Sequence, residues 1–303
     1  RLRRTKESGA NRGLAGMAAE TLFSPSPDCE ITLLRPFLGR TRDALRCFLR
    51  ECRQDWVEDP TNLDMNYERV RVRQILQEQP ELSARLIAYG ALQARFRLLM
   101  ARDAAHFIET ACQVDPFASI WIDGAAFDKQ PESLGIFVMQ VLLSLAGGQS
   151  YLPSYEKTQR LIAARGGTLA RVMLRRRKES WCLVREARGL PQPSVLNKDP
   201  LIWDMRFHLS RENAGGAGIE IQAGAFFSAR ERRARLSAMT GGAMATGFIN
   251  KAGFAAFPLA RVEGQDNFCL RPCVGPFEHY CADFDQPLRQ ALRRLFTLSS
   301  IRA

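Results

Sequence analysis

Residues 56–73 read WVEDPTNLDMNYERVRVR, a stretch that divides into a turn and a helix. Asp59-Pro60 and Asn62 supply turn chemistry, because proline fixes its own backbone angle and Asn and Asp side chains bond nearby backbone groups. A helical segment is expected to follow over 67–76, and its Arg69 and Arg73 are four residues apart and share one face. The stretch therefore predicts a loop that leads into an arginine-bearing helix.

Upstream of this loop the sequence predicts a strand, a short turn and a helix. Residues 31–38 (ITLLRPFL) indicate a buried strand that Pro36 and Gly39 bring to an end. Thr41 is placed to cap a helix with Leu45, Phe48, Leu49 and Cys52 on one face. Residues 1–6 are compatible with the end of another helix, and residues 13–17 (GLAGM) with a turn.

Residues 80–190 show mainly a helical period. Leu82, Leu86, Tyr89, Phe96 and Leu99 form one apolar stripe, and a second stripe runs through 131–146. Such stripes are typical of core, and Trp56 is also expected there. A shorter helix over 154–164 precedes two strands, 168–174 and 181–185, around a turn at 175–178.

The last third of the chain predicts a small α+β unit. A linker over 189–193 precedes strands at 201–209 and 218–222 and helices at 228–239 and 286–296.

The positive charge of the chain is concentrated around the predicted hairpin. The chain carries 43 Lys and Arg against 32 Asp and Glu, a net charge of +11, which suits a polyanionic partner. Residues 151–190 hold 10 basic and 3 acidic side chains. The run Arg175, Arg176, Arg177 and Lys178 could be only a solvated turn. Together with Arg160, Arg165, Arg171 and Arg185 it favours a surface that contacts phosphates.

Other classes of function have little support in the sequence. The longest apolar run, 134–146, is interrupted by Gln140 and is too short to cross a bilayer, and no secretory signal is visible, so we expect a cytoplasmic protein. Cys269, Cys273, His279 and Cys281 are crowded and lack the paired spacing of a zinc site. None of the three histidines lies beside a candidate nucleophile in the sequence. We predict no metal ligands and assign no catalytic residue.

An ordered set of motifs resembles the tRNA(Ile)-lysidine synthases. Residues 13–17 (GLAGM), 34–38 (LRPFL), 56–62 (WVEDPTN) and 67–73 (YERVRVR) match the family's GLxxM-like turn, R-P-L-L-like strand, W-x-E-D-x-S/T-N loop and Y-x-R-x-x-x-R helix. The resemblance is looser after residue 80. It implies an α/β fold in three parts: residues 1–79 as the end of a PP-loop domain, similar to adenine nucleotide hydrolases; 80–190 as a mainly helical domain with the basic hairpin; and 191–303 as a small α+β domain.

The resemblance also implies an activity. In that family ATP, with Mg²⁺, adenylates the C2 oxygen of the wobble cytidine of tRNA(Ile), and L-lysine then displaces AMP, which changes codon reading from AUG to AUA. Carried over by residue, it implies that seven side chains border the nucleotide and tRNA pocket: Arg35, Glu58, Asp59, Asn62, Tyr67, Arg69 and Arg73. The chain's own basic run adds expected RNA-backbone contacts at Arg171, Arg175, Arg176, Arg177 and Lys178. The sequence leaves open whether the protein forms a homodimer.

The chain also departs from the family. The Ser-Gly-Gly-x-Asp-Ser loop that cradles the pyrophosphate does not occur, and Val70 stands where many members have Asn. We therefore expect an N-terminally truncated enzyme that is inactive alone. The alternatives are a non-catalytic RNA-binding remnant or scaffold, and a tRNA-thiolating relative. The last fits least, because Cys47 and Cys52 do not form a Cys-x-x-Cys pair.

Overall fold

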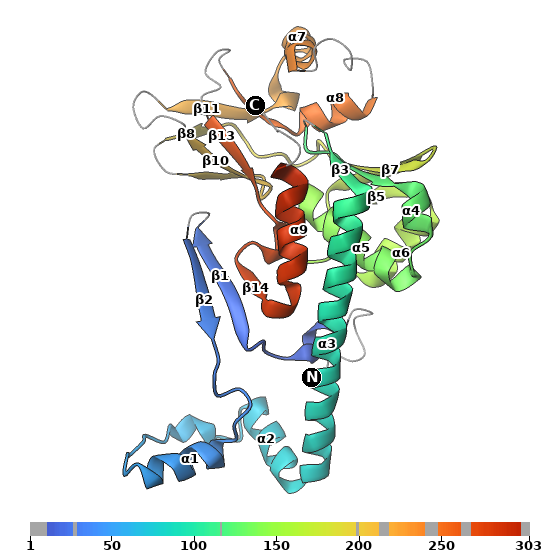
Figure 1. The fold of residues 1–303 in the computed structure, drawn as a ribbon. Coiled ribbons are helices and arrows are strands. Elements are labelled where there is room, and N and C mark those ends of the chain that lie inside the picture. Colours follow the sequence, from blue (N-terminus) through green and yellow to red (C-terminus); the bar gives the residue numbers. More distant parts are fainter. Residues whose placement is uncertain are drawn as a thin grey trace.

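The computed structural model describes residues 11–26, 29–115, 117–197, 200–211, 218–239, 248–261 and 268–297. A body of sheets and helices lies at one end of a long helix, and two shorter helices lie at the other end (Figure 1). The helix end expected over residues 1–6 falls outside the described residues.

Runs of helices and runs of strands follow one another along the chain. The helices are α1 (Arg42–Glu51), α2 (Glu68–Glu78), α3 (Pro80–Ala111), α4 (Gly124–Asp128), α5 (Glu132–Gly147), α6 (Tyr155–Ala163), α7 (Ala229–Met239), α8 (Phe248–Ala255) and α9 (Gln286–Thr297). The strands are β1 (Glu20–Ser26), β2 (Cys29–Leu34), β3 (Cys112–Val114), β4 (Ile120–Asp123), β5 (Gly166–Leu169), β6 (Val172–Arg177), β7 (Ser180–Arg185), β8 (Ser194–Leu196), β9 (Leu201–Trp203), β10 (Phe207–Arg211), β11 (Ile219–Ala223), β12 (Pro258–Ala260), β13 (Phe268–Pro272) and β14 (Tyr280–Ala282). The predicted combination of helices and strands is confirmed.

The middle of the chain contains a five-stranded antiparallel sheet in the order β3-β4-β7-β6-β5. The apolar helix α5 packs against it and is buried from Leu134 to Gly147. Among its polar side chains, the Gln140 amide nitrogen donates to the Pro153 carbonyl at 2.6 Å and the Ser144 hydroxyl to the Tyr151 carbonyl at 2.9 Å. This core is as predicted for 131–146, whereas β3 and β4 were not foreseen.

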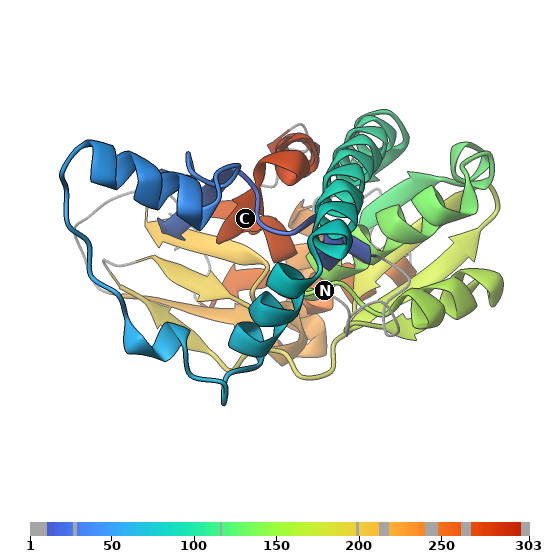
Figure 2. The same cartoon turned by 90° about the horizontal axis from the view of Figure 1, so that it is seen from below.

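The C-terminal third forms two further sheets, β13-β10-β9 and β12-β11-β8. Seen from below, they lie on one side of α3, and the five-stranded sheet lies on the other (Figure 2). The strand expected over 201–209 is interrupted, because Asp204 and Met205 adopt left-handed backbone angles (φ 51° and 55°). The strand expected over 168–174 is divided in the same way at Ala170 and Arg171 (φ 52° and 64°).

A third sheet, β14-β1-β2, brings the two ends of the described chain together. β1 pairs with β14 so that Phe23 faces Tyr280, and Arg289 and Arg293 of α9 both contact Glu30 of β2. Helix α3 packs along α9 as well. These contacts join residues of different predicted domains, 1–79, 80–190 and 191–303. The domain boundaries stay a sequence-based prediction.

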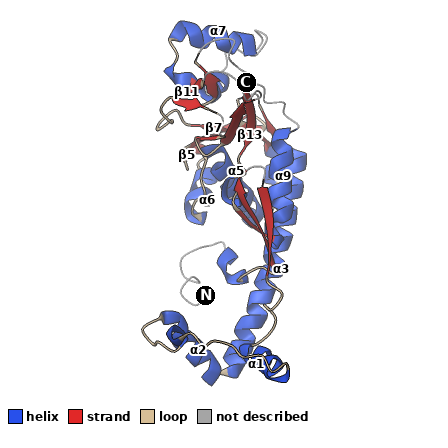
Figure 3. Cartoon of the chain, turned by 90° about the vertical axis from the view of Figure 1, so that its left-hand side faces the viewer, coloured by secondary structure: helices blue, strands red, loops and turns tan. Residues whose placement is uncertain are grey.

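Three predictions of burial were wrong. β2 ends at Leu34 and is exposed along its whole length, because it is the edge strand of its sheet. On α3, Leu82 and Leu86 are half-buried while Tyr89, Phe96 and Leu99 are exposed. This half of the helix extends away from the body (Figure 3), and the continuously packed part begins near Ala101. Trp56 is also exposed, at 38%.

Candidate functional site

Glu58 holds the predicted loop against helix α1. Its carboxylate accepts hydrogen bonds from Arg42 and Arg46 of α1 and from the Trp56 indole nitrogen, the last at 2.7 Å. The hydrogen bond from Trp56, followed by that from Arg46, lowers the pKa of Glu58 below its ordinary value. Helix α1 itself begins where predicted, with the Thr41 hydroxyl accepting from the Ala44 N–H at 3.2 Å. The Glu58 carboxylate therefore orients the loop through contacts within the protein.

Asp59 and Asn62 form the turn that follows. The Asp59 carboxylate accepts from the backbone N–H of Thr61 at 2.9 Å and from its hydroxyl at 2.8 Å, and these bonds lower the pKa of Asp59. The Asn62 N–H donates to the Asp59 carbonyl at 3.0 Å, which closes the short 3-10 helix Pro60–Asn62. Asp59 thus has the capping role that turn chemistry predicts, and Asn62 contributes its backbone N–H.

Tyr67, Arg69 and Arg73 lie exposed at the start of α2. The Arg69 guanidinium lies over the Tyr67 ring, 5.4 Å from its centroid, and both side chains face solvent. Arg73 is exposed one turn further along. Val70, the position that departs from the family pattern, is buried at 7% exposure, so it serves packing here. A cation stacked on an aromatic ring, with a second cation one turn away, is suited to a phosphate or a nucleobase.

Arg35 is committed elsewhere. Its guanidinium donates to the Ala18 carbonyl at 3.1 Å and to the Thr21 hydroxyl at 2.8 Å, which ties the end of β2 to the start of β1. The structure therefore divides the seven predicted residues into three groups: Arg35 at the sheet, Glu58 with Asp59 and Asn62 in the loop, and Tyr67 with Arg69 and Arg73 on α2. It does not bring Arg35 into contact with the other groups among the described residues.

The basic hairpin extends further than predicted. Strands β6 and β7 pair up to Arg177 and Ser180, so the turn lies at Lys178-Glu179, with Lys178 in the left-handed region (φ 46°). Arg175, Arg177 and Lys178 are exposed. Arg176 points to the other face, donates to Asp128 at 2.8 Å and lies over the Trp181 ring. Three of the four predicted hairpin cations, Arg175, Arg177 and Lys178, are thus exposed for contact with an RNA backbone, whereas Arg176 is bonded within the protein.

Arg171 and Arg185 belong instead to a buried ion-pair cluster around Asp204. Arg185 is 2% exposed and donates to both Asp204 oxygens, at 2.8 and 3.0 Å, and Arg171 reaches the same carboxylate at 2.5 Å. Arg185 cannot contact phosphate from this position, so its inclusion in the basic surface was wrong. Arg171, predicted as an RNA contact, is half-buried and bonded to Asp204, Gly147 and Gly189.

Sequence reasoning missed Arg42, Arg46 and Asp204. Arg42 and Arg46 are four residues apart on α1, a spacing that places them on one helix face toward a carboxylate. Asp204 had no comparable signal, because its partners lie 19 and 33 residues away in the chain.

Two negative findings apply to the described part of the chain. Nowhere in it do three or more His, Cys, Asp or Glu side chains converge as metal ligands would. A search of the same residues for a helix with the length and hydrophobicity of a membrane span returned none.

Comparisons with known proteins agree with the motifs. The PP-loop domain family matches residues 1–79. A tRNA(Ile)-lysidine synthase of Mesorhizobium japonicum is 32% identical over 97% of this chain and 66% of its own length. Those of Bartonella tribocorum and Hyphomonas neptunium are 32% and 33% identical, over 69% and 63% of this chain and 42% and 53% of their own lengths. The matches thus span about two fifths to two thirds of the length of these curated relatives.

The motif loop and helix, the match of the PP-loop family to residues 1–79 and the similarity that continues over almost the whole chain all agree. This chain belongs to the tRNA(Ile)-lysidine synthase family.

Proposed function

We propose that this chain provides the tRNA-binding body of a tRNA(Ile)-lysidine synthase, a ligase that joins L-lysine to C2 of the wobble cytidine of tRNA(Ile) and so changes codon reading from AUG to AUA. The observation that carries the proposal is the 32% identity to the Mesorhizobium relative over 97% of the chain. The exposed cations of α2 and of the hairpin support it, because they are suited to a phosphate backbone.

The described residues do not form a complete site for ATP and Mg²⁺. Glu58 and Asp59 are the carboxylates of the motif loop, and both are engaged by Arg42, Arg46 and Thr61. The sequence has no Ser-Gly-Gly-x-Asp-Ser loop to cradle a pyrophosphate. ATP would supply an adenylyl group that makes the C2 oxygen a good leaving group.

The chain's own residues act on the RNA side of the reaction. Arg69, stacked on Tyr67, and Arg73 present two cations on one exposed face of α2, where they can hold the sugar-phosphate backbone near the anticodon. Glu58 fixes the loop that precedes this helix through α1 and Trp56. Positioning of the tRNA by a preorganised surface lowers the entropic part of the barrier.

The test compares this chain alone with the same chain fused behind the loop-bearing segment of the Mesorhizobium relative. With tRNA(Ile), ATP and labelled lysine, the fusion is expected to form lysidine and this chain alone is not, since it lacks the residues that hold the pyrophosphate. Equilibrium dialysis with labelled ATP checks the same expectation directly, and micromolar binding by this chain would contradict it.

The second candidate is a non-catalytic RNA-binding protein or scaffold. It is favoured by the engagement of Glu58, Asp59 and Arg35 in contacts within the protein. A fusion that binds ATP and tRNA(Ile) but forms no lysidine would support this alternative over the ligase.

A further inference from the structure

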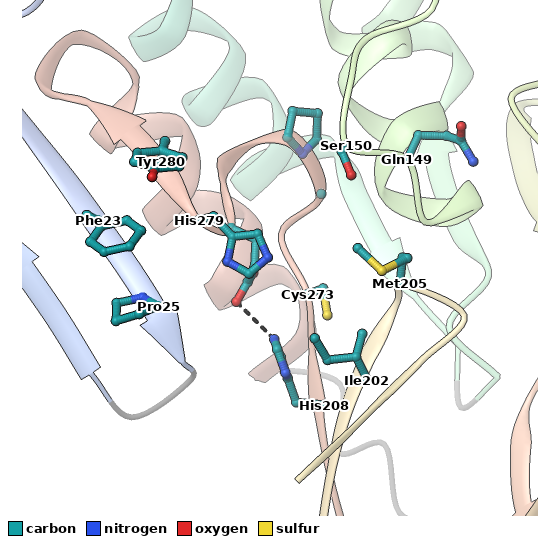
Figure 4. Close-up of a pocket in the computed structure, with 13 residues that line it drawn as sticks. Phe23, Pro25, Gln149, Ser150, Ile202, Met205, His208, Cys273, His279 and Tyr280 are labelled. Carbon is teal, nitrogen blue, oxygen red and sulfur yellow. Dashed lines mark hydrogen bonds and ion pairs between the residues drawn. The ribbon is translucent and has the colours of Figure 1, made fainter. Parts of the chain in front are cut away.

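A cavity of about 460 Å³ lies where three distant parts of the chain meet (Figure 4). Phe23 of β1 and Tyr280 of β14 line one side, Ile202 and His208 of strands β9 and β10 another, and Gln149 and Ser150 after α5 a third. The volume is within the range of small-ligand sites, about 300 to 1,000 Å³. None of the residues predicted from the motifs lines this cavity.

Two stacked aromatic rings form one wall of the cavity. Phe23 and Tyr280 are cross-strand partners in β1 and β14, and their ring centroids are 4.8 Å apart with an interplanar angle of 22°. Tyr280 is 61% exposed. An exposed tyrosine on its own is ordinary. A ring that is held flat by a second ring at the edge of a cavity, however, offers the kind of surface on which nucleobases stack.

A buried polar pair lies at another part of the lining. His208 is 5% exposed, and its Nε2 is 3.1 Å from Oε1 of Glu278. The second Glu278 oxygen accepts from the Val274 N–H at 2.6 Å, which fixes the carboxylate. The His208 Nδ1 has no hydrogen-bond partner among the described residues. The hydrogen bonds of Glu278 with His208 and Val274 fix the imidazole in place, so this part of the lining is preformed.

We propose that this cavity receives one unpaired nucleobase of the bound RNA, stacked on Tyr280. The inference rests on the proposed function, because it takes the polyanionic partner to be RNA. The flat aromatic wall favours a base over a peptide side chain, which needs no such flat surface. Arg271 is the register partner of His208 in β10 and β13, so an exposed cation lies on the strand beside that lining residue.

The test uses this chain and a short single-stranded RNA that carries 2-aminopurine at one internal position. Stacking on Tyr280 is expected to change the fluorescence of the probe on binding, and the same RNA with an abasic site there should bind more weakly. Tyr280→Ala should weaken binding by about fivefold to a hundredfold, the range for removing one base-stacking aromatic, and Tyr280→Phe should retain it.

Phe226→Ala is the matched control, because Phe226 is another exposed aromatic that does not line the cavity. It should bind like wild type, and thermal melting should show that Tyr280→Ala is folded. Equal binding of the base-containing and abasic RNAs, the outcome for a cavity that takes a peptide, would overturn the proposal. If the base and abasic RNAs bind equally but tRNA still binds with a steep salt dependence, the cavity proposal fails and the proposed function stands. If the wild-type chain does not bind tRNA at all, both the cavity proposal and the proposed function fail.

Discussion

At the scale of single residues, neighbours of the same type in the sequence have different partners. Arg69 and Arg71 are two residues apart, yet Arg69 is stacked on Tyr67 in solvent while Arg71 donates to the carbonyls of Met65 and Asn66. Arg69→Ala in the fused enzyme should therefore reduce lysidine formation at least about tenfold, or about 1.4 kcal/mol, with little change in melting temperature. Arg71→Ala should instead lower the melting temperature by loosening the loop. A large loss of stability with normal activity in Arg69→Ala would show that Arg69 is structural.

Asp204 is the residue on which the buried arginine cluster depends. Its side chain is fully buried, as is that of Arg185. Asp204→Asn should lower the free energy of unfolding by about 3 to 5 kcal/mol, because it leaves a buried guanidinium without its counter-charge. Asp128→Asn removes the exposed partner of Arg176 and should cost less than about 1 kcal/mol. Denaturant unfolding measures the free energy of unfolding of both variants. Equal losses would show that the buried cluster around Asp204 is no more stabilising than the exposed pair of Asp128 with Arg176.

Glu278 should make stability depend on pH in the acid range. Burial acts to raise the pKa of Glu278, but the hydrogen bonds from His208 and the Val274 N–H outweigh it and hold the pKa below the ordinary 4.5. A lowered folded-state pKa stabilises the protein above the unfolded value and loses that contribution as the pH falls through the folded one. The stability difference between wild type and Glu278→Gln should thus be largest above pH 4.5 and narrow below it. Glu220→Gln, at an exposed ion pair with Arg261, is the surface control.

At the scale of secondary-structure elements, the hairpin β6-β7 is the element most suited to an RNA backbone. Replacing Arg175, Arg177 and Lys178 together with Gln should weaken cognate and non-cognate tRNA alike and reduce the slope of log affinity against log salt by up to about 2 to 3 units, since each phosphate contributes about 0.7 to 0.9. Arg176→Gln should leave the slope nearly unchanged, because that side chain is bonded to Asp128. Filter binding at several salt concentrations measures both. Loss confined to cognate tRNA would mean that the hairpin reads bases.

The elements that were predicted well from the sequence are those whose caps, turns or apolar runs lie within the element or next to it in the chain. Thr41 before α1, Asp59-Pro60 before α2 and the continuous apolar run of α5 each act through neighbours in the chain. The strand breaks at 170–171 and 204–205 were missed because Ala, Arg, Asp and Met adopt positive φ there without a glycine to mark it. The candidate site shows the same contrast. Its turn was predictable from neighbouring residues, whereas the contacts of Arg35 and Arg171 were not, because their partners lie in other elements.

At the scale of the whole molecule, α3 separates two regions with different surfaces. The sheets and α5 surround the main apolar core, while the segment 35–96, which contains α1, α2 and the first part of α3 with their connecting loops, exposes Phe37, Phe48, Val57, Leu63, Ile87 and Phe96. Amphipathic periodicity predicts an apolar face but not what covers it, which is why the α3 stripe was assigned to the core. Burial depends on contacts that only the tertiary structure supplies.

The pairing of β1 with β14 has a consequence for how the protein is made. The contacting strands are separated by most of the chain, so this sheet has a very high contact order and its closure carries a large loop entropy. During synthesis β1 leaves the ribosome well before residues 280–282 and has no partner on that side until they follow. The stacked Phe23-Tyr280 wall and the ion pairs of Glu30 with Arg289 and Arg293 therefore cannot form until more than 250 further residues have been added to the growing chain.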